Sequence, residues 1–323
     1  MPTAEALWTL PPGHSEIRQE TLPNLAANEV QVRTLFTAIS RGTESLVYRD
    51  QVPVSEHQRM RAPFQQGDFG NALKYGYCNV GQVVDGPASL RHRTVFCLYP
   101  HQTQYQVPAS AVTVLPQGVP PERAILAANM ETAINGLWDA APRVGDRLTV
   151  VGGGVVGALM AWLMGRVPGT DVTLVDVNPQ RQTLANALGV GFSLPHQAPG
   201  NQDVVVHASG NAEGLNTAVR LAGNEVEIIE MSWYGTPATA VFLGGAFHSK
   251  RLTLRASQVG TIAPSRAARK TYADRLQIAL SLLTEPTLDC LISGESAFAE
   301  LPTVLHKLST QPGDALCHRI RYS

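Results

Sequence analysis

The chain has 323 residues, of which 44% are hydrophobic and 16% charged, and its formal net charge is -1 at pH 7. This length is too great for one ordinary core and predicts two domains. The balanced charge argues against proteins that bind nucleic acid or an anionic membrane surface. The first 20 residues lack the basic start and apolar stretch of a signal peptide, so we expect a cytoplasmic protein without a membrane partner.

The N-terminal third, up to about residue 115, predicts an antiparallel, turn-rich β domain. Glu29–Phe36 and Gly81–Val84 alternate or run in β-branched residues, with proline and glycine between such segments. Pro120 and Pro121 then suit the first turn of a helix, where no intrahelical N–H bond is lost. We therefore expect one connecting helix that extends over residues 124–140.

From Arg147 onward the pattern changes to short apolar strands that alternate with helices. An uncharged run, 148–165, is long enough for a membrane span, but three adjacent glycines interrupt it. We interpret it as a buried strand followed by a helix. Strands separated by helices predict a parallel sheet covered on both faces. The expected strands are Leu148–Val151, Val172–Val177, Asp203–His207, Val226–Ile229 and Leu252–Arg255, and the expected helices are Val155–Gly165, Gln180–Leu188 and Ala212–Ala222.

The C-terminal segment resembles the first region more than the α/β region. It begins like a strand, continues as an amphipathic helix around Leu301 and Leu305, and ends in a further strand. We expect it to fold back onto the N-terminal domain. The prediction is therefore a doubly wound Rossmann sheet, residues 138–285, inserted into a β-rich domain formed by residues 1–137 and 286–323.

A dinucleotide-binding motif lies between the first predicted strand and helix of the α/β region. Gly152, Gly154 and Gly157 satisfy GxGxxG. In that motif the first glycine permits a tight turn, the second lets the backbone approach a pyrophosphate, and the third lets the helix pack closely. The pyrophosphate meets the N–H groups at the start of the helix. The predicted phosphate-binding residues are Gly152, Gly153, Gly154, Val155, Val156 and Gly157.

The next strand ends in a carboxylate that predicts the identity of the cofactor. Asp176 follows Gly157 by 19 positions (176 − 157), close to the spacing of the carboxylate that binds the adenosine ribose. Such a carboxylate accepts hydrogen bonds from both ribose hydroxyls and repels a 2′-phosphate. We therefore expect NAD rather than NADP. Asn178 and Arg181 belong to the same predicted site, and Arg181 is the residue that would favour a phosphate instead.

The order of these parts resembles the medium-chain dehydrogenase/reductase superfamily over nearly the whole chain. Supporting motifs are Gly42-Thr43-Glu44, the segment 76–83 (GYCNVGQV), Val144-Gly145-Asp146-Arg147 and Ala208-Ser209-Gly210. The resemblance implies a GroES-like catalytic domain, a small-molecule substrate and a homodimer. It also implies that Ser209, Gly210, Thr132 and Arg41 contact the cofactor.

The zinc ligands of metal-dependent members of this superfamily are not conspicuous in the chain. The resemblance places those positions at Arg41, Tyr77 and about Ala128, none of which is a usual zinc ligand. The cysteine-rich lobe that binds a structural zinc is missing too. We therefore expect no zinc, and a protein group that polarises the reacting oxygen.

Four residues are the candidates for that catalytic role. Thr43 corresponds to a hydroxyl that relays a proton in the zinc-dependent alcohol dehydrogenases, and Tyr77 stands where a ligand would be. Glu44 and His101 are further proton-transfer candidates.

Three functions are consistent with these residues. The leading one is hydride transfer between NAD and an alcohol/carbonyl pair, and a partial resemblance to bacteriochlorophyllide hydroxyethyl dehydrogenases makes a bulky substrate conceivable. The second is reduction of an activated C=C bond, as in enoyl and quinone reductases. The third is a non-catalytic dinucleotide sensor or scaffold.

Overall fold

The computed structural model describes residues 3–323. The chain divides into two compact units: unit 1 runs to Ala128 and resumes at Leu280, and unit 2 is Asn129–Ala279. The units change over inside two helices, α3 (Ala127–Ala140) and α8 (Tyr272–Leu282). The sequence analysis predicts the two domain boundaries at residues 137/138 and 285/286.

Unit 2 is built around a six-stranded sheet in which every pairing is parallel. Its order is β12-β11-β10-β13-β14-β15, so the chain winds in one direction from β10 and in the other from β13. In doubly wound sheets of this kind the ligand binds beyond the carboxyl ends of the strands at that reversal. The strands are β10 Arg147–Val151, β11 Asp171–Val175, β12 Gly191–Ser193, β13 Val204–His207, β14 Glu227–Glu230 and β15 Thr253–Ala256.

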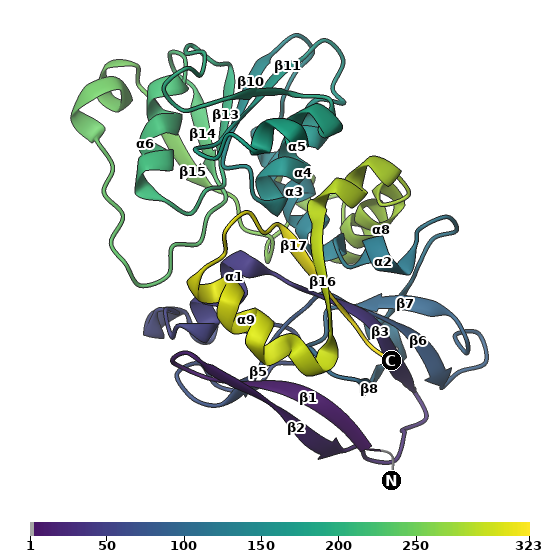
Figure 1. The fold of residues 1–323 in the computed structure, drawn as a ribbon. Coiled ribbons are helices and arrows are strands. Elements are labelled where there is room, and N and C mark those ends of the chain that lie inside the picture. The colour runs from purple at the N-terminus through teal and green to yellow at the C-terminus, as the bar shows by residue number, and fades with distance from the viewer. Residues whose placement is uncertain (1–2) are drawn as a thin grey trace. The chain divides into compact units, whose positions relative to one another are not determined.

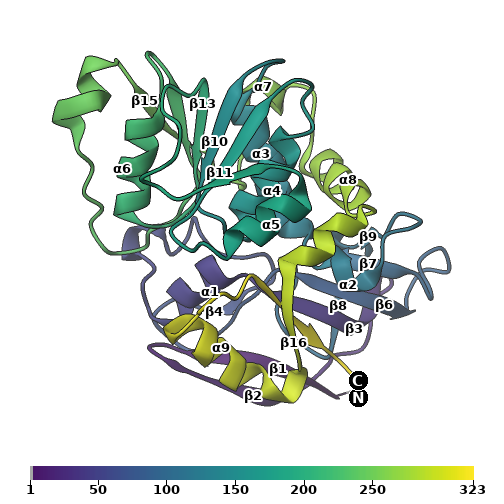
Figure 2. The same ribbon diagram turned by 45° about the horizontal axis from the view of Figure 1, so that its top comes forward.

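Alternate residues of these strands point into two separate cores. Leu148 and Val150 pack with Met160 and Ala161 of α4, whereas Val151 and Val205 pack with the helix α6. Helices α3, α4 and α5 cover one face of the sheet and α6 the other (Figures 1 and 2). Burial on both faces explains the continuous apolar strands, and the predicted doubly wound sheet is confirmed. These helices are α4 Val155–Met164, α5 Arg181–Leu188 and α6 Ala212–Leu221, and the short α7 is Pro264–Ala267.

Unit 1 contains two sheets with mostly antiparallel pairing. The smaller has the order β2-β1-β5-β4, and the larger has the order β16-β17-β3-β6-β7-β9, with β8 paired to β3. Alternating valines, among them Val30, Val32 and Val83, fill the core of the larger sheet. The strands are β1 Thr3–Leu10, β2 His14–Thr21, β3 Glu29–Ile39, β4 Gln66–Gly67, β5 Leu73–Lys74, β6 Asn79–Asp85, β7 Thr94–Cys97, β8 Gln104–Pro108, β9 Thr113–Val114, β16 Ile292–Ala297 and β17 Cys317–Arg321.

The C-terminal segment returns to unit 1 as predicted. β17 pairs antiparallel with β3, so that Ile320 lies opposite Thr37. The helix α9 (Leu301–Thr310) places Leu301 and Leu305 in a core with Leu7 of β1. The remaining helical segments are α1 Arg41–Tyr48, α2 Pro121–Ala124 and the short segments Val54–Glu56, Ala109–Ala111, Leu243–Phe247, Pro286–Leu291 and Phe298–Glu300.

Two predicted helix limits are wrong. The connecting helix is interrupted between α2 and α3, where the Leu126 N–H bonds the Arg123 carbonyl in a tight i→i+3 turn that buries Ile125 and Leu126. The helix expected from residue 180 begins at Arg181, because Asn178 accepts the Gln180 N–H in a turn before the helix. The uncharged run 148–165 does form β10 and α4, and within residues 3–323 no helix has the length and apolarity that a membrane span requires.

Candidate active site

The glycine-rich loop of unit 2 joins β10 to α4 at the carboxyl end of the sheet. Gly152 has φ +111°, and a Cβ at this residue would lie 2.6 Å from the backbone nitrogen of Ser209. A Cβ at Gly157 would lie 1.9 Å from the Gly152 carbonyl oxygen. Both positions therefore require glycine, since backbone atoms occupy the space where a side chain would begin.

Gly154 differs from its neighbours because it faces open space. A Cβ there would meet no heavy atom within 4 Å. Gly154 is also the N-cap of α4 and provides no side chain to bond the first-turn N–H groups, which include those of Val155 and Val156. These groups and the positive end of the helix dipole therefore fit a pyrophosphate.

Asp176, directly after β11, is bonded to the loop. Its Oδ2 accepts the Gly153 N–H at 2.6 Å, and its Oδ1 accepts the Asn178 N–H at 2.8 Å. Arg181 lies beside the same glycine, since a Cβ on Gly153 would be 3.2 Å from Arg181 Cγ. A carboxylate can accept about four hydrogen bonds, so Asp176 keeps capacity for ribose hydroxyls. The structure thus brings Asp176, Asn178 and Arg181 to the predicted phosphate loop.

Ser209 and Gly210 form the turn that follows β13, the strand on the other side of β10. Gly210 has φ +64°, and its N–H donates to the Ser232 hydroxyl at 3.0 Å. Because Ser209 touches the Gly152 position, this turn borders the glycine loop. Both residues are exposed.

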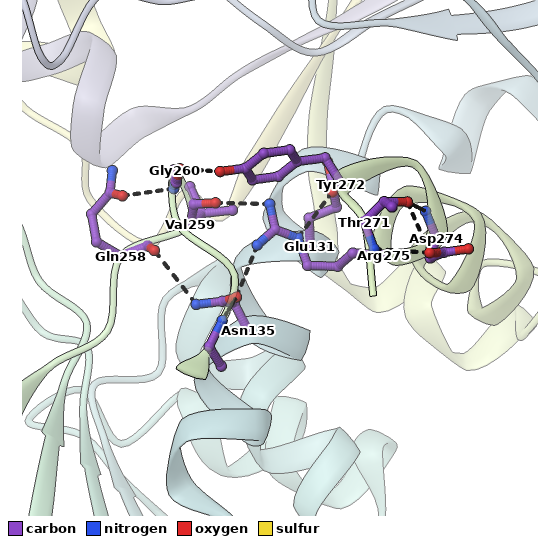
Figure 3. A network of polar contacts seen from close by, with 10 residues as sticks. Glu131, Asn135, Gln258, Val259, Gly260, Thr271, Tyr272, Asp274 and Arg275 are labelled. Carbon is purple, nitrogen blue, oxygen red and sulfur yellow. Dashed lines mark hydrogen bonds and ion pairs between the residues drawn. The ribbon is translucent and has the colours of Figure 1, made fainter. Parts of the chain in front are cut away.

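Thr132 lies on α3. Its neighbour in the chain, Glu131, belongs to a buried polar network that sequence reasoning missed (Figure 3). Arg275 of α8 donates to Glu131 Oε1 at 3.1 Å, to Asn135 Oδ1 at 2.8 Å and to the Val259 carbonyl at 2.7 Å. Burial raises the pKa of Glu131, and the neighbouring guanidinium opposes that effect. The network ties the segment after β15 to the helix that carries Thr132.

A cluster of hydroxyl groups in unit 1 joins the turn before β6 to the start of α1. The Tyr77 hydroxyl donates to Ser40 Oγ at 2.6 Å, and Thr43 is its second hydrogen-bond partner. Tyr77 and Thr43 are half-buried and Ser40 is buried. Burial raises the pKa of Tyr77 above its ordinary value, although bonds from Ser40 and Thr43 oppose this effect. Tyr77 is therefore a neutral hydroxyl at physiological pH.

A buried histidine–carboxylate pair lies behind these hydroxyls. Glu44 Oε1 accepts the Ser40 N–H at 2.7 Å, and Glu44 Oε2 lies 2.9 Å from His101 Nε2. The other ring nitrogen of His101 lies 2.7 Å from the Thr37 hydroxyl, which in turn contacts Tyr322. The four predicted catalytic residues, Thr43, Tyr77, Glu44 and His101, thus belong to one connected cluster. Thr37 and Tyr322, 285 positions apart, gave no signal in the sequence.

The donor set of this cluster does not fit a catalytic zinc ion. Arg41 begins α1 with a guanidinium and Ala128 has only a methyl group, neither of which binds zinc. Glu44 and His101 bond each other. Over residues 3–323, no three acidic, cysteine or histidine side chains are arranged to hold a metal. Arg41 lies in unit 1, and its predicted contact with the cofactor stays a prediction.

Comparison with known proteins identifies the fold. No family model matches the chain. D-guloside 3-dehydrogenase of Escherichia coli K12 is 27% identical over 232 residues, which cover 61% of the chain and 64% of that protein. The chain therefore spans less than two thirds of this curated relative.

Solved structures match over nearly the whole length. L-idonate 5-dehydrogenase of Escherichia coli K-12 has a TM-score of 0.81 at 15% identity, with 99% of this chain and 98% of that one covered. The chain has the medium-chain dehydrogenase/reductase fold. A putative zinc-binding dehydrogenase from Sinorhizobium meliloti 1021, bound to NADP, shares this fold with a TM-score of 0.78 at 16% identity, over 99% of this chain and 100% of that one.

Proposed function

We propose that the chain is a zinc-independent, NAD-linked dehydrogenase that transfers hydride between the nicotinamide and an alcohol/carbonyl pair. The observation that carries this proposal is the hydroxyl cluster of Tyr77, Ser40 and Thr43, backed by Glu44 and His101. On the resemblance to the superfamily, Tyr77 corresponds to a position that holds a metal ligand in zinc-dependent members. The neutral phenol offers the hydrogen-bond donor that a developing alkoxide requires.

Each residue of the cluster has a separate part in the reaction. NAD, when bound, takes up or supplies the hydride at its nicotinamide ring. In carbonyl reduction, the Tyr77 hydroxyl turns its proton from Ser40 Oγ to the substrate oxygen and donates it, and the Ser40 and Thr43 hydroxyls then donate to Tyr77 and stabilise the resulting phenolate. In alcohol oxidation the proton moves in the opposite direction. Glu44 and His101 are positioning residues, because Glu44 holds the Ser40 N–H and His101 holds Glu44.

The cofactor proposed is NAD, with NADP as the less favoured form. Support comes from Asp176, whose carboxylate lies at the loop and would meet a 2′-phosphate with like charge. The NADP-bound Sinorhizobium meliloti protein shows that this fold also accepts the phosphate. The preference must therefore depend on local residues, and Asp176 opposes Arg181 in setting it.

We propose a secondary alcohol of a polyhydroxylated molecule as the first substrate class to test. D-guloside 3-dehydrogenase and L-idonate 5-dehydrogenase are named for sugar-derived substrates. The half-exposed side chains of the cluster itself, Tyr77 and Thr43, are uncharged hydroxyl groups. Such groups suit a neutral polyol better than a substrate with an anionic reacting group.

The test is a turnover assay with a metal analysis. Purified protein is incubated with NADH and ketones, aldehydes and enones, or with NAD and sugar alcohols and glycosides, and absorbance of the reduced ring is followed. Oxidation of NADH by carbonyls, with well under one zinc per chain and no loss on chelation, supports the proposal. Turnover of enones alone indicates C=C reduction, and tight NADH binding without turnover indicates a sensor. Stoichiometric zinc needed for activity would overturn zinc independence.

Two further properties belong to the proposal. We propose a homodimer on the resemblance to the superfamily, and a cytoplasmic protein on the N-terminal sequence. Size-exclusion chromatography with light scattering tests the first, and cell fractionation tests the second.

A further inference from the structure

A second buried histidine–carboxylate pair lies in unit 2, at the carboxyl ends of β13 and β14. His207 and Glu230 are paired residues of these neighbouring strands, and His207 is 0% exposed. His207 Nδ1 lies 2.7 Å from Glu230 Oε2, and His207 Nε2 lies 2.6 Å from the Ser209 hydroxyl. The Ser232 N–H and the Tyr234 hydroxyl donate to the same carboxylate. A serine, a histidine and a glutamate are thus linked in series.

Burial of this pair needs a reason, because the other buried residues of the two strands are valine and isoleucine. A histidine–carboxylate pair taken out of water gains little over apolar residues of the same size. Burial alone would raise the pKa of Glu230, but the bonds from His207 and Ser232 outweigh it and lower that pKa. Glu230 is therefore an ionised acceptor. The pair lies where the strands of a doubly wound sheet meet their ligand.

The same arrangement occurs on the other side of the glycine loop, at Asp176. One oxygen of Asp176 accepts the N–H two residues further on, from Asn178, and one oxygen of Glu230 accepts the N–H of Ser232 in the same way. The other oxygen of Asp176 reaches the loop after the neighbouring strand β10 through Gly153. The other oxygen of Glu230 reaches the loop after β13 through His207 and Ser209. A Rossmann sheet has two such halves, one for each nucleoside of the cofactor.

The hydrogen-bond order fixes what Ser209 offers to a ligand. The Glu230 carboxylate only accepts, so His207 Nδ1 donates to it, and a ring with this single N–H leaves Nε2 as an acceptor. The single hydroxyl hydrogen of Ser209 then goes to Nε2. Ser209 Oγ consequently has only lone pairs to offer to a ligand, so it can accept a hydrogen bond but cannot donate one. A phosphate oxygen, which also only accepts, is a poor partner, whereas a ribose hydroxyl is a good one.

We propose that Ser209, oriented by His207 and Glu230, accepts a hydrogen bond from a hydroxyl of the ribose on the nicotinamide side of the cofactor. This inference rests on the proposed dinucleotide site. Asp176 then serves the adenosine ribose and Ser209 the second ribose. His207 and Glu230 are positioning residues, because they act on the ligand only through Ser209.

The test compares ADP-ribose, which carries the second ribose, with ADP, which lacks it. Both are titrated as competitors of NADH fluorescence in the parent protein and in Ser209→Ala. One neutral hydrogen bond corresponds to about threefold to tenfold in affinity. We expect Ser209→Ala to weaken ADP-ribose by that factor and to leave ADP unchanged. The matched control is Ser265→Ala, which removes an exposed hydroxyl on α7 and should change neither affinity.

A second variant displaces Ser209 without removing its hydroxyl. A Cβ on Gly214 of α6 would lie 2.1 Å from Ser209 Oγ and 2.9 Å from His207 Nε2. Gly214→Ala favours the helix and forces the serine away from its histidine. We expect the same loss for ADP-ribose and none for ADP.

Several outcomes overturn the inference. Equal losses of ADP and ADP-ribose would show a merely structural role, and unchanged affinities in both variants would show that Ser209 does not touch the ribose. If the parent binds neither NADH nor ADP, the dinucleotide site itself is wrong and the proposed function fails with it. If the parent binds NADH but neither variant changes the affinity for ADP-ribose, this inference fails and the proposed function stands.

Discussion

The two units contain the same chemical pair in two different settings. His101 bonds Glu44 through Nε2 and the Thr37 hydroxyl through Nδ1, whereas His207 bonds Glu230 through Nδ1 and the Ser209 hydroxyl through Nε2. Both rings are buried. The difference lies in the hydroxyl: Thr37 is 1% exposed, whereas Ser209 is exposed.

This contrast shows that a buried histidine cannot be interpreted from its carboxylate alone. In unit 1 the hydroxyl bonded to the histidine, Thr37, contacts the buried Tyr322. The carboxylate bonded to the same histidine, Glu44, connects through Ser40 to the half-buried Tyr77. In unit 2 the hydroxyl itself is presented at the sheet edge. We therefore assign positioning of the Ser40–Tyr77 hydroxyl cluster to the carboxylate side in unit 1 and ligand binding to the hydroxyl side in unit 2.

The largest effect is expected from Gly154→Val, which tests whether unit 2 binds the cofactor. The space around Gly154 is open, so the protein should fold, but the branched side chain would occupy the place of the pyrophosphate. NADH binding should fall below detection in a fluorescence titration. The matched control is Gly200→Val, also in open space but away from the loop. Retained NADH binding by the first variant would move the phosphate site elsewhere.

The next effect separates chemistry in unit 1 from binding in unit 2. Tyr77→Phe removes the proposed acid, and loss of a general acid typically lowers rate by about 10²- to 10⁴-fold. We expect that fall in kcat for carbonyl reduction with the NADH affinity unchanged. Tyr99→Phe, which removes a phenol outside the cluster, should retain the rate. An unaltered kcat in Tyr77→Phe would transfer the proton to another group.

The pH profile gives an independent test of the same residue. Burial raises the pKa of Tyr77, so the phenol keeps its proton to a higher pH than an exposed tyrosine does. The kcat of carbonyl reduction should therefore not decline through loss of this acid below about pH 10, the ordinary tyrosine value. A decline near neutral pH that is absent in Tyr77→Phe would show that the residue ionises there.

Cofactor preference depends on one charge at the first ribose. Like charges at Asp176 and a 2′-phosphate repel by about 1–4 kcal/mol, which corresponds to about fivefold to several-hundred-fold in affinity. NADH should bind more tightly than NADPH by that factor, and Asp176→Ser should reduce or invert the preference. Parallel fluorescence titrations measure both. A parent protein that prefers NADPH would assign control of this pocket to Arg181.

Sequence reasoning reached the elements and residues whose signal is local. The glycine loop, Asp176 and the strands of unit 2 follow from spacing and periodicity within one supersecondary unit. The cluster of Thr43, Tyr77, Glu44 and His101 could be proposed only through the family resemblance, because its members come from separate segments.

The networks that position these groups could not be predicted from spacing. His207 and Glu230 are 23 positions apart and Arg275 and Glu131 are 144 apart, and only the folded sheet and helix packing bring them together. A weak signal existed for the first pair, since each residue ends a run of apolar strand residues where a ligand edge is expected. The break between α2 and α3 was missed because the packing of Ile125 and Leu126, not local propensity, produces it.

The smallest expected effect completes the comparison of the two histidines, because it makes in unit 1 the change that Ser209→Ala makes in unit 2. Thr37→Val removes the buried hydroxyl while keeping the side-chain shape, and it leaves His101 Nδ1 and the Tyr322 hydroxyl without this partner. A buried group left unsatisfied costs about 1–3 kcal/mol. We expect the free energy of unfolding in urea to fall by that amount, with kcat and the ADP-ribose and ADP affinities unchanged. Loss of kcat at full stability would show that Thr37 helps to position Tyr77 through His101 and Glu44, whereas loss of ADP-ribose affinity alone would remove the distinction between the two histidines.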